Sequence, residues 1–102
     1  MRKFVENGGT FILTYWSGVV DENDLCVLGG TPGGLMDVMG LRSTEIDGLY
    51  DGESNTVKAV VGDVAYKCEH LCQLVDVKTA EPLFVYGEDF YAGTPAMTVN
   101  EF

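Results

Sequence analysis

Basic side chains, histidine and long apolar runs are scarce in this sequence. Its 102 residues include six Lys and Arg against 16 Asp and Glu, which gives a formal net charge of −10 with the single His neutral. A field of that sign repels the phosphates of nucleic acids and of anionic membranes, so neither is expected as a partner. No apolar run approaches the ~20 residues that span a bilayer. Residues 1–6 are not followed by the apolar stretch of a secretory signal.

Cysteine is equally sparse. The three residues are Cys26, Cys68 and Cys72, an odd, low number that argues against a disulfide framework and fits a reducing cytoplasm. His70 lies between Cys68 and Cys72, but a structural zinc site needs four ligands at closer, paired spacings. We therefore expect buried free thiols, no metal and a cytoplasmic location.

No set of side chains typical of an active site is recognisable. The sequence has no Gly-x-Ser-x-Gly elbow, and no nucleophile, base and orienting group can be assigned around His70. A flavin would need a phosphate loop after the first strand, where acidic residues 21–24 lie instead. We expect no catalytic residue and no cofactor.

Paired carboxylates, which a glycosidase needs, are abundant but uninformative. Sixteen acids in 102 residues produce near pairs by chance. Asn100-Glu101 resembles the Asn-Glu pair of many barrel glycosidases, yet nothing around it predicts a barrel that would preorganise it. We interpret that pair as a coincidence.

The strongest fold signal lies in residues 5–15. Asn7 and Gly8 are typical of a helix end, and residues 10–15 form a nearly continuous run of β-branched and aromatic residues. Such a run favours a strand covered on both faces, as in a parallel sheet. Helix, glycine stop and buried strand predict an α/β fold, a three-layer α/β/α arrangement with a largely parallel sheet.

The later elements are predicted from turn residues and periodicity. Residues 31–40 predict a short helix with Thr31 as N-cap and Gly40 as its stop. Residues 56–67 predict a β-hairpin turning at Gly62-Asp63, which implies a mixed edge to the sheet. Residues 69–75 suit a helix or a strand equally. The ranges that predict the remaining strands are 41–50, 83–86 and 96–99.

Residues 1–102 are expected to form a single partial domain. The first helix has no beginning, and the last strand is followed by no turn or cap. We therefore expect both ends to lie inside a larger structure, truncated from a longer chain.

Four aromatic residues stand out on or beside predicted loops: Trp16, Tyr86, Phe90 and Tyr91. Aromatic side chains on loops are enriched where protein surfaces meet. They are equally typical of core or loop anchors. The alternatives are an oligomer contact, a sugar platform or an ordinary core.

Five phrases taken together resemble a known family, in order and over nearly the whole chain. They are FVENGGTFILTY (4–15), SGVVDEND (17–24), LGGTPGGL (28–35), EIDGL (45–49) and YGEDFYAGTPA (86–96). They resemble the middle domain of glycoside hydrolase family 42 β-galactosidases. The resemblance implies a flavodoxin-like trimerisation domain between a catalytic (β/α)₈ barrel and a small β domain. The two catalytic glutamates of the family lie in the barrel, outside the matched part.

Three hypotheses follow. The first is a non-catalytic assembly domain that holds a homotrimer together through loops 17–25 and 86–95, while the barrel binds the galactoside. The second is that this chain itself hydrolyses galactosides. The third is a stand-alone flavodoxin-like module that binds a small ligand.

Overall fold

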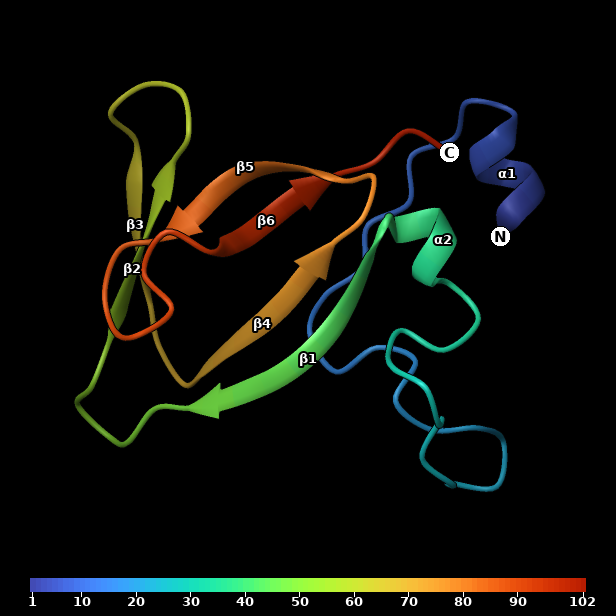
Figure 1. Ribbon diagram of the computed structural model, residues 1–102, viewed down its shortest axis with the longest axis horizontal. Helices are drawn as coiled ribbons and strands as arrows, with labels where there is room; N and C mark the ends of the chain where they lie inside the picture. Colours follow the sequence, from blue (N-terminus) through green and yellow to red (C-terminus); the bar gives the residue numbers. More distant parts are fainter.

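The structure, a computed structural model, describes all 102 residues and contains two short helices and six strands (Figure 1). These are α1 (Arg2–Glu6), α2 (Met36–Met39), β1 (Leu41–Gly48), β2 (Asn55–Ala59), β3 (Ala65–Cys68), β4 (Leu71–Val77), β5 (Glu81–Tyr86) and β6 (Pro95–Val99). Strands β1 and β4 form one sheet, and a second sheet has the order β3-β2-β5-β6. Every strand pair is antiparallel. Neither of the two helices has the length and apolar character of a membrane span.

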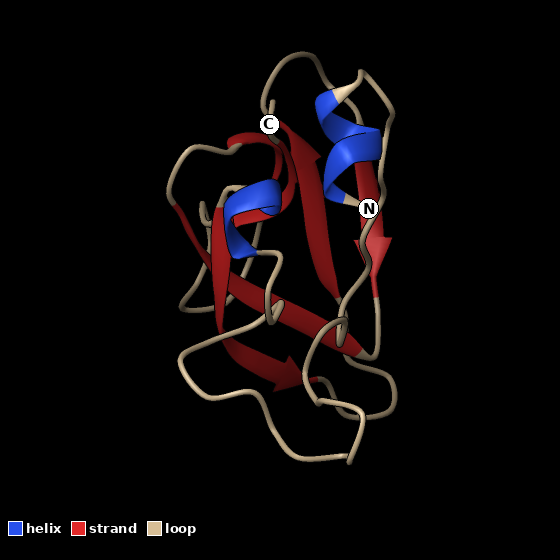
Figure 2. Ribbon diagram, turned by 90° about the vertical axis from the view of Figure 1, so that its right-hand side faces the viewer, coloured by secondary structure: helices blue, strands red, loops and turns tan.

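The predicted flavodoxin-like fold, with its largely parallel three-layer sheet, is wrong. Helices α1 and α2 have five and four residues, too few to cover two faces of a sheet. Figure 2 shows both helices near the two chain ends. Parallel pairing needs a crossover of a dozen or more residues between strands. Here no helix follows α2, so no helical crossover connects any two strands, and every strand pair is antiparallel.

The run Thr10–Tyr15, predicted as a buried strand, is not a strand. It lies outside both sheets, and its backbone makes no hydrogen bond to other backbone groups. Phe11 and Leu13 are half-buried, whereas Ile12 is 82% exposed and Tyr15 is exposed as well. A β-branched run supplies strand propensity, but a strand also needs a neighbour to pair with, and no strand pairs with this segment.

The predicted helix 31–40 is confirmed only in its last turn. Thr31 pairs with Ser43 through an isolated β-bridge instead of capping a helix, so the helix begins at Met36. Its predicted stop is correct, because Gly40 takes the left-handed conformation at φ 67°. The Asn100 amide then donates to the carbonyl of Val38 at 2.9 Å. Asn100, interpreted as a coincidental motif, thus caps α2.

The predicted hairpin is confirmed as β2 and β3, with Val57 opposite Tyr66. The connection is longer than the two-residue turn expected, since it spans residues 60–64. The ambiguous residues 69–75 resolve as strand, most of β4. The strands predicted over 41–50, 83–86 and 96–99 are also present, as β1, β5 and β6.

The hydrophobic core lies between the two sheets and is small. Only eight of the 102 residues are buried. Cys72 of β4, Tyr86 of β5 and Tyr91 of the β5–β6 loop form its centre. Leu49, Val57, Cys68, Leu74 and Ala96 pack against them. The core therefore fixes the β5–β6 loop, residues 87–94, against the sheets.

Candidate functional site

The four predicted aromatic residues separate into two buried and two exposed side chains. Tyr86 and Tyr91 are buried within the chain, with Tyr91 only 2% exposed. Phe90 and Trp16 are 75% and 61% exposed. In this conformation only Phe90 and Trp16 present rings that another molecule can reach. Whether any of the four contacts a partner stays a prediction.

Three of these rings form a stack from the core to the surface. The rings of Tyr86 and Tyr91 meet edge to face with centroids 5.1 Å apart, and those of Tyr91 and Phe90 do the same at 4.9 Å. This geometry is favourable for aromatic pairs because it sets the positive edge of one ring on the negative face of the next. Phe90 therefore has a rigid support beneath an exposed ring.

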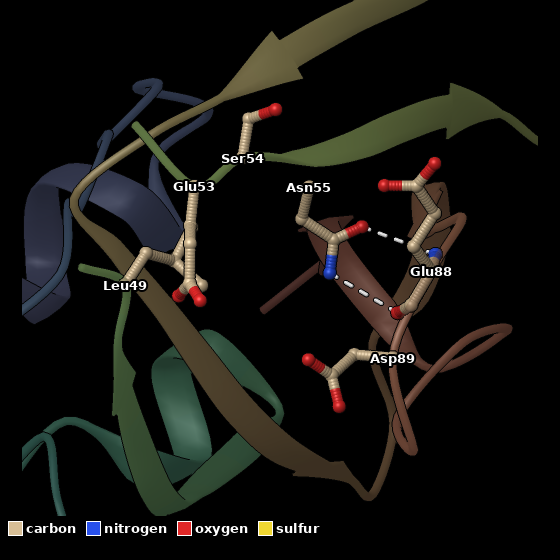
Figure 3. A pocket seen from close by; sticks show the side chains of 6 residues that line it. All are labelled: Leu49, Glu53, Ser54, Asn55, Glu88 and Asp89. Atoms are coloured by element: carbon tan, nitrogen blue, oxygen red, sulfur yellow. Dashed lines mark hydrogen bonds between the residues drawn. The ribbon is translucent and has the colours of Figure 1, made fainter. Parts of the chain in front are cut away.

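The loop that carries Phe90 is held by Asn55, a buried polar side chain at the start of β2. Its Oδ1 accepts the N–H groups of Thr56 at 2.7 Å and Glu88 at 3.1 Å, and its Nδ2 donates to the Glu88 carbonyl at 3.1 Å (Figure 3). Within the loop, the Asp89 carboxylate accepts the N–H of Phe90 at 2.7 Å. These bonds satisfy groups that burial would otherwise leave unpaired.

The hydroxyls of the two buried tyrosines are structural donors. Tyr91 Oη donates to Asp47 Oδ2 at 2.6 Å, and Tyr86 Oη donates to the Gln73 carbonyl at 3.1 Å. Burial raises the pKa of Tyr86 to about 12, helped by the nearby Cys72 thiol. Burial and the bond to Asp47 also raise the pKa of Tyr91. Both phenols stay protonated at neutral pH, so neither is a base or a nucleophile there.

Beside this loop lies an open hollow of about 290 Å³ with an acidic lining. Its lining residues are Leu49, Glu53, Ser54, Asn55, Glu88 and Asp89. In Figure 3 the side chains of Glu53, Glu88 and Asp89 come from two separate turns. Three carboxylates and one apolar residue do not form a pocket for a phosphate or an apolar ligand.

The cysteines are free thiols, but they are not all buried as expected. Cys72 is buried, Cys68 is half-buried and Cys26 is exposed. The sulfurs of Cys68 and Cys72 lie 3.7 Å apart, and burial raises the pKa of Cys68 to about 11. No group of three or more His, Cys, Asp or Glu side chains is placed so as to hold a metal ion.

Trp16 lies apart from the aromatic stack. Its backbone N–H donates to the Gln73 side chain at 3.3 Å, and that side chain in turn donates to Ser43 Oγ at 2.6 Å. Its indole is left exposed. Sequence reasoning missed Asn55, Asp47 and Gln73, the polar residues that hold the aromatic side chains and their loops. Nothing in the sequence around them distinguishes them from ordinary surface residues.

A comparison with family models matches residues 1–102 to the β-galactosidase trimerisation domain. Among curated proteins, the chain is 50% identical over 105 residues to β-galactosidase BglY of Alicyclobacillus acidocaldarius, covering 98% of the chain and 15% of that protein. It is 47% identical over 107 residues to β-galactosidase Pbg of Clostridium perfringens, covering 100% of the chain and 16% of that protein.

The solved structures that match this chain are also β-galactosidases. The β-galactosidase of Rahnella sp. R3 matches with a TM-score of 0.94 at 46% identity, over 98% of this chain and 16% of that one. A glycoside hydrolase family 42 β-galactosidase, Gan42B of G. stearothermophilus, matches with a TM-score of 0.91 at 39% identity, over 99% and 14% of the two chains. The chain thus spans about a sixth of the length of these relatives. On this evidence, the chain belongs to the β-galactosidase trimerisation domain family of glycoside hydrolase family 42 enzymes.

Proposed function

We propose that this chain is the non-catalytic, self-associating part of a longer β-galactosidase polypeptide and that it assembles that enzyme as a homotrimer. The observation that carries this proposal, beside the family, is exposed apolar surface. Twenty large hydrophobic side chains are exposed, whereas only five hydrophobic residues are buried. So many exposed and so few buried apolar side chains favour the covering of part of this surface by other protein surface.

Hydrolysis of terminal β-galactosides with retention is assigned, on the same proposal, to the barrel part of that polypeptide. The acidic hollow beside residues 87–94 does not supply an alternative active site. Its Asn55 is committed to the backbone of Glu88, and Glu53 accepts the N–H of Tyr50 at 3.1 Å. A cytoplasmic location is proposed with it, supported by three free cysteines.

The association proposal is tested by light scattering on the β-galactosidase that contains this chain. We expect the mass of three subunits, and we expect Phe90→Ser to weaken the assembly because it removes an exposed, rigidly supported ring. Tyr50→Ser is the matched control, since Tyr50 is also an exposed aromatic on a turn. Tyr91 is unsuitable for this test because its removal would damage the core. A wild-type mass of one subunit at micromolar concentration would overturn the proposal.

The non-catalytic part of the proposal is tested separately with a chromogenic β-galactoside. The 102-residue chain should show no turnover above buffer, while the full polypeptide hydrolyses the substrate. Turnover by the 102-residue chain that is abolished by Glu88→Gln or Glu101→Gln would contradict the assignment.

A further inference from the structure

Cys68 and Cys72 meet at a corner where the two sheets join. Cys68 ends β3, an edge strand of the four-stranded sheet, and Cys72 lies second in β4 of the two-stranded sheet. Only residues 69 and 70 separate these strands, and the two sulfurs lie 3.7 Å apart. The third cysteine, Cys26, is exposed in the loop that precedes α2. The corner is therefore the one place in this chain where two thiols are in contact.

Neighbouring strands hold each of these two cysteines in position. Cys68 lies opposite Asn55 of β2, and Cys72 lies opposite Asp47 of β1. Between them, the backbone of His70 takes the left-handed conformation at φ 73°, which turns the chain from one sheet to the other. The two thiols are thus brought together by the backbone of the corner, and their contact is part of the fold.

The contact is close to the geometry that a disulfide needs. The sulfurs of a disulfide are about 2.0 Å apart, so these two would have to approach by about 1.7 Å. The thiol of Cys68 otherwise donates only a weak hydrogen bond, to the Leu71 carbonyl at 3.6 Å. Bond formation therefore requires a side-chain rotation that breaks one weak contact, and both sheets keep their pairing.

The two thiols differ in how far they can be reached from solvent. Cys72 is fully buried in the core against Tyr86 and Tyr91, whereas Cys68 is half-buried. A small oxidant such as hydrogen peroxide therefore reaches Cys68 first, and Cys72 is placed to react with the product. Burial and the neighbouring thiol raise the pKa of Cys68 to about 11, so little of the reactive thiolate is present at neutral pH. The pair should stay reduced at trace peroxide and react with sustained excess.

We propose that Cys68 and Cys72 are an oxidation site for peroxide, at which they form a reversible disulfide that joins the two sheets covalently. The Cys68 thiolate attacks one oxygen of hydrogen peroxide, the O–O bond breaks, and a sulfenic acid forms while the other oxygen leaves as water after protonation. The sulfur of Cys72 then attacks the Cys68 sulfur. The S–O bond breaks, and the hydroxyl leaves as water with the proton of Cys72.

The step is balanced with peroxide as the oxidant. Two thiols and one hydrogen peroxide give one disulfide and two waters, and two electrons pass from the sulfurs to the peroxide oxygens. A thiol reductant reverses the reaction by thiol–disulfide exchange. The site lies within one chain and goes beyond the proposed function, because it needs neither a second subunit nor a galactoside.

The first test treats the full β-galactosidase polypeptide with millimolar hydrogen peroxide, unfolds it in N-ethylmaleimide and digests it with trypsin. Cleavage after Lys67 and Lys78 releases residues 68–78, a peptide that contains both cysteines of the corner and no other. Before oxidation, mass spectrometry should find two maleimide groups on this peptide. After oxidation it should find none and a mass lower by two hydrogens, and dithiothreitol should restore both thiols.

The second test uses variants of the same polypeptide. In Cys68→Ser, Cys72 should still react fully with N-ethylmaleimide after the peroxide treatment, because the oxidant does not reach the buried thiol. Cys26→Ser is the matched control, since Cys26 contacts neither cysteine of the corner, and it should form the disulfide at the wild-type rate.

The third test measures whether the bond joins the sheets more tightly. A disulfide restricts the opened chain, so the backbone amides of β3 and β4 should exchange hydrogen at least about threefold more slowly in the oxidised protein. Oxidised Cys68→Ser should exchange as the reduced protein does. Equal exchange in oxidised and reduced wild type would overturn the covalent join between the sheets.

The remaining outcomes decide the oxidation site itself. The proposal is overturned if peptide 68–78 keeps two free thiols, or if Cys68 proceeds to a sulfinic or sulfonic acid while Cys72 stays free. Loss of the Cys72 thiol in Cys68→Ser at the wild-type rate overturns the assignment of Cys68 as the first to react. A monomeric wild type would overturn the proposed assembly and leave this inference standing, because no readout here depends on subunit mass.

Discussion

Residues 1–35 and residues 41–99 are both rich in apolar side chains, but they use them differently. The second region contains all six strands and the three central core residues. The first contains one five-residue helix, and Pro32 is its only buried residue. Eight of its large hydrophobic side chains are exposed, Ile12 and Leu28 among them.

The difference shows that backbone pairing, more than apolar content, decides what this chain buries. In the second region, antiparallel neighbours satisfy the backbone and bring alternate side chains together between the sheets. In the first region, Thr10–Tyr15 is largely apolar, but no strand pairs with it. We infer that residues 41–99 supply most of the folding stability, and residues 1–35 supply much of the surface available for contacts.

The largest expected effect comes from removing the central ring of the second region. Tyr91→Ala should destabilise the protein by about 3–5 kcal/mol, because it leaves a cavity between Tyr86 and Phe90. Phe90→Ala removes a ring from the same stack that is mostly exposed, so it should cost about 1 kcal/mol or less. Urea unfolding of both variants measures the free energy of unfolding that each one loses. Equal losses would show that the core does not depend on Tyr91.

A smaller effect is expected where the two regions join, at Gly40. Gly40 and Gly34 have nearly the same left-handed backbone, with φ of 67° and 68°. An added Cβ would lie 2.5 Å from side-chain atoms of Asn100 and Thr79 at Gly40, but would meet nothing within 4 Å at Gly34. Gly34→Ala should therefore cost about 1 kcal/mol for backbone strain alone.

Gly40→Ala should cost about 2–3 kcal/mol, since the Asn100 cap must also move. Thermal unfolding of the two alanine variants measures the difference directly. If the two lose the same stability, then Asn100 moves aside at no cost, and its hydrogen bond to the Val38 carbonyl contributes little.

Local turn and strand signals in the second region were sufficient to predict most of its elements. Gly40 stops a helix because only glycine adopts its backbone angle cheaply, and residues 83–86 have the β propensity of the strand that they form between β2 and β6. The sheet arrangement could not be predicted in the same way. The run Thr10–Tyr15 carries the composition of a buried parallel strand, but composition does not say whether a neighbouring strand is present.

The sequence predicted the aromatic residues of the candidate site but not which of them are buried. Trp16, Tyr86, Phe90 and Tyr91 stood out by residue type, yet type does not distinguish an anchor from a contact. Phe90 is exposed and Tyr91 is buried because of the conformation of their loop. Asn55 fixes that conformation through its hydrogen bonds to Glu88, which lies 33 residues further along the chain. The family resemblance identified the domain but implied a fold that the structure does not have.

Alkaline pH should weaken the second region through its buried phenols. The pKa of Tyr86 is raised to about 12 by burial, above its usual value of 10, so the folded state holds the proton more tightly than the unfolded state. The corresponding stability is complete below about pH 10 and is lost as the pH rises towards about 12. Tyr86→Phe should flatten this decline without abolishing it, because the pKa of Tyr91 is raised as well.

Urea unfolding between pH 9 and pH 12 measures the decline, with absorbance at 295 nm to follow tyrosine ionisation. Tyr50→Phe, which changes an exposed tyrosine, is the control and should leave the slope unchanged. A slope that is identical in wild type and Tyr86→Phe would contradict the role given to the buried hydroxyl.

The smallest effect is expected at the ion pair that connects α1 of the first region to α2. Arg2 donates to both carboxylate oxygens of Asp37, at 2.6 and 2.8 Å, and to the Gly34 carbonyl. The Arg2 guanidinium holds the pKa of Asp37 below its usual value. A lowered pKa in the folded state gives stability that is present above about pH 4 and is lost as the pH falls through the folded value. Because the pair is exposed, its contribution is small and salt screens it.

Asp37→Asn should therefore lower stability slightly at pH 7 and not at all below the folded pKa of Asp37. The carboxyl carbon shift of Asp37 in an NMR titration locates that pKa, and added salt at about 1 M should remove the difference between wild type and variant. A helix α1 that detaches in Asp37→Asn would show that this single ion pair places it. If α1 stays, the Arg2 bond to the Gly34 carbonyl and its position over the Phe102 ring are sufficient to hold α1 without the Asp37 carboxylate.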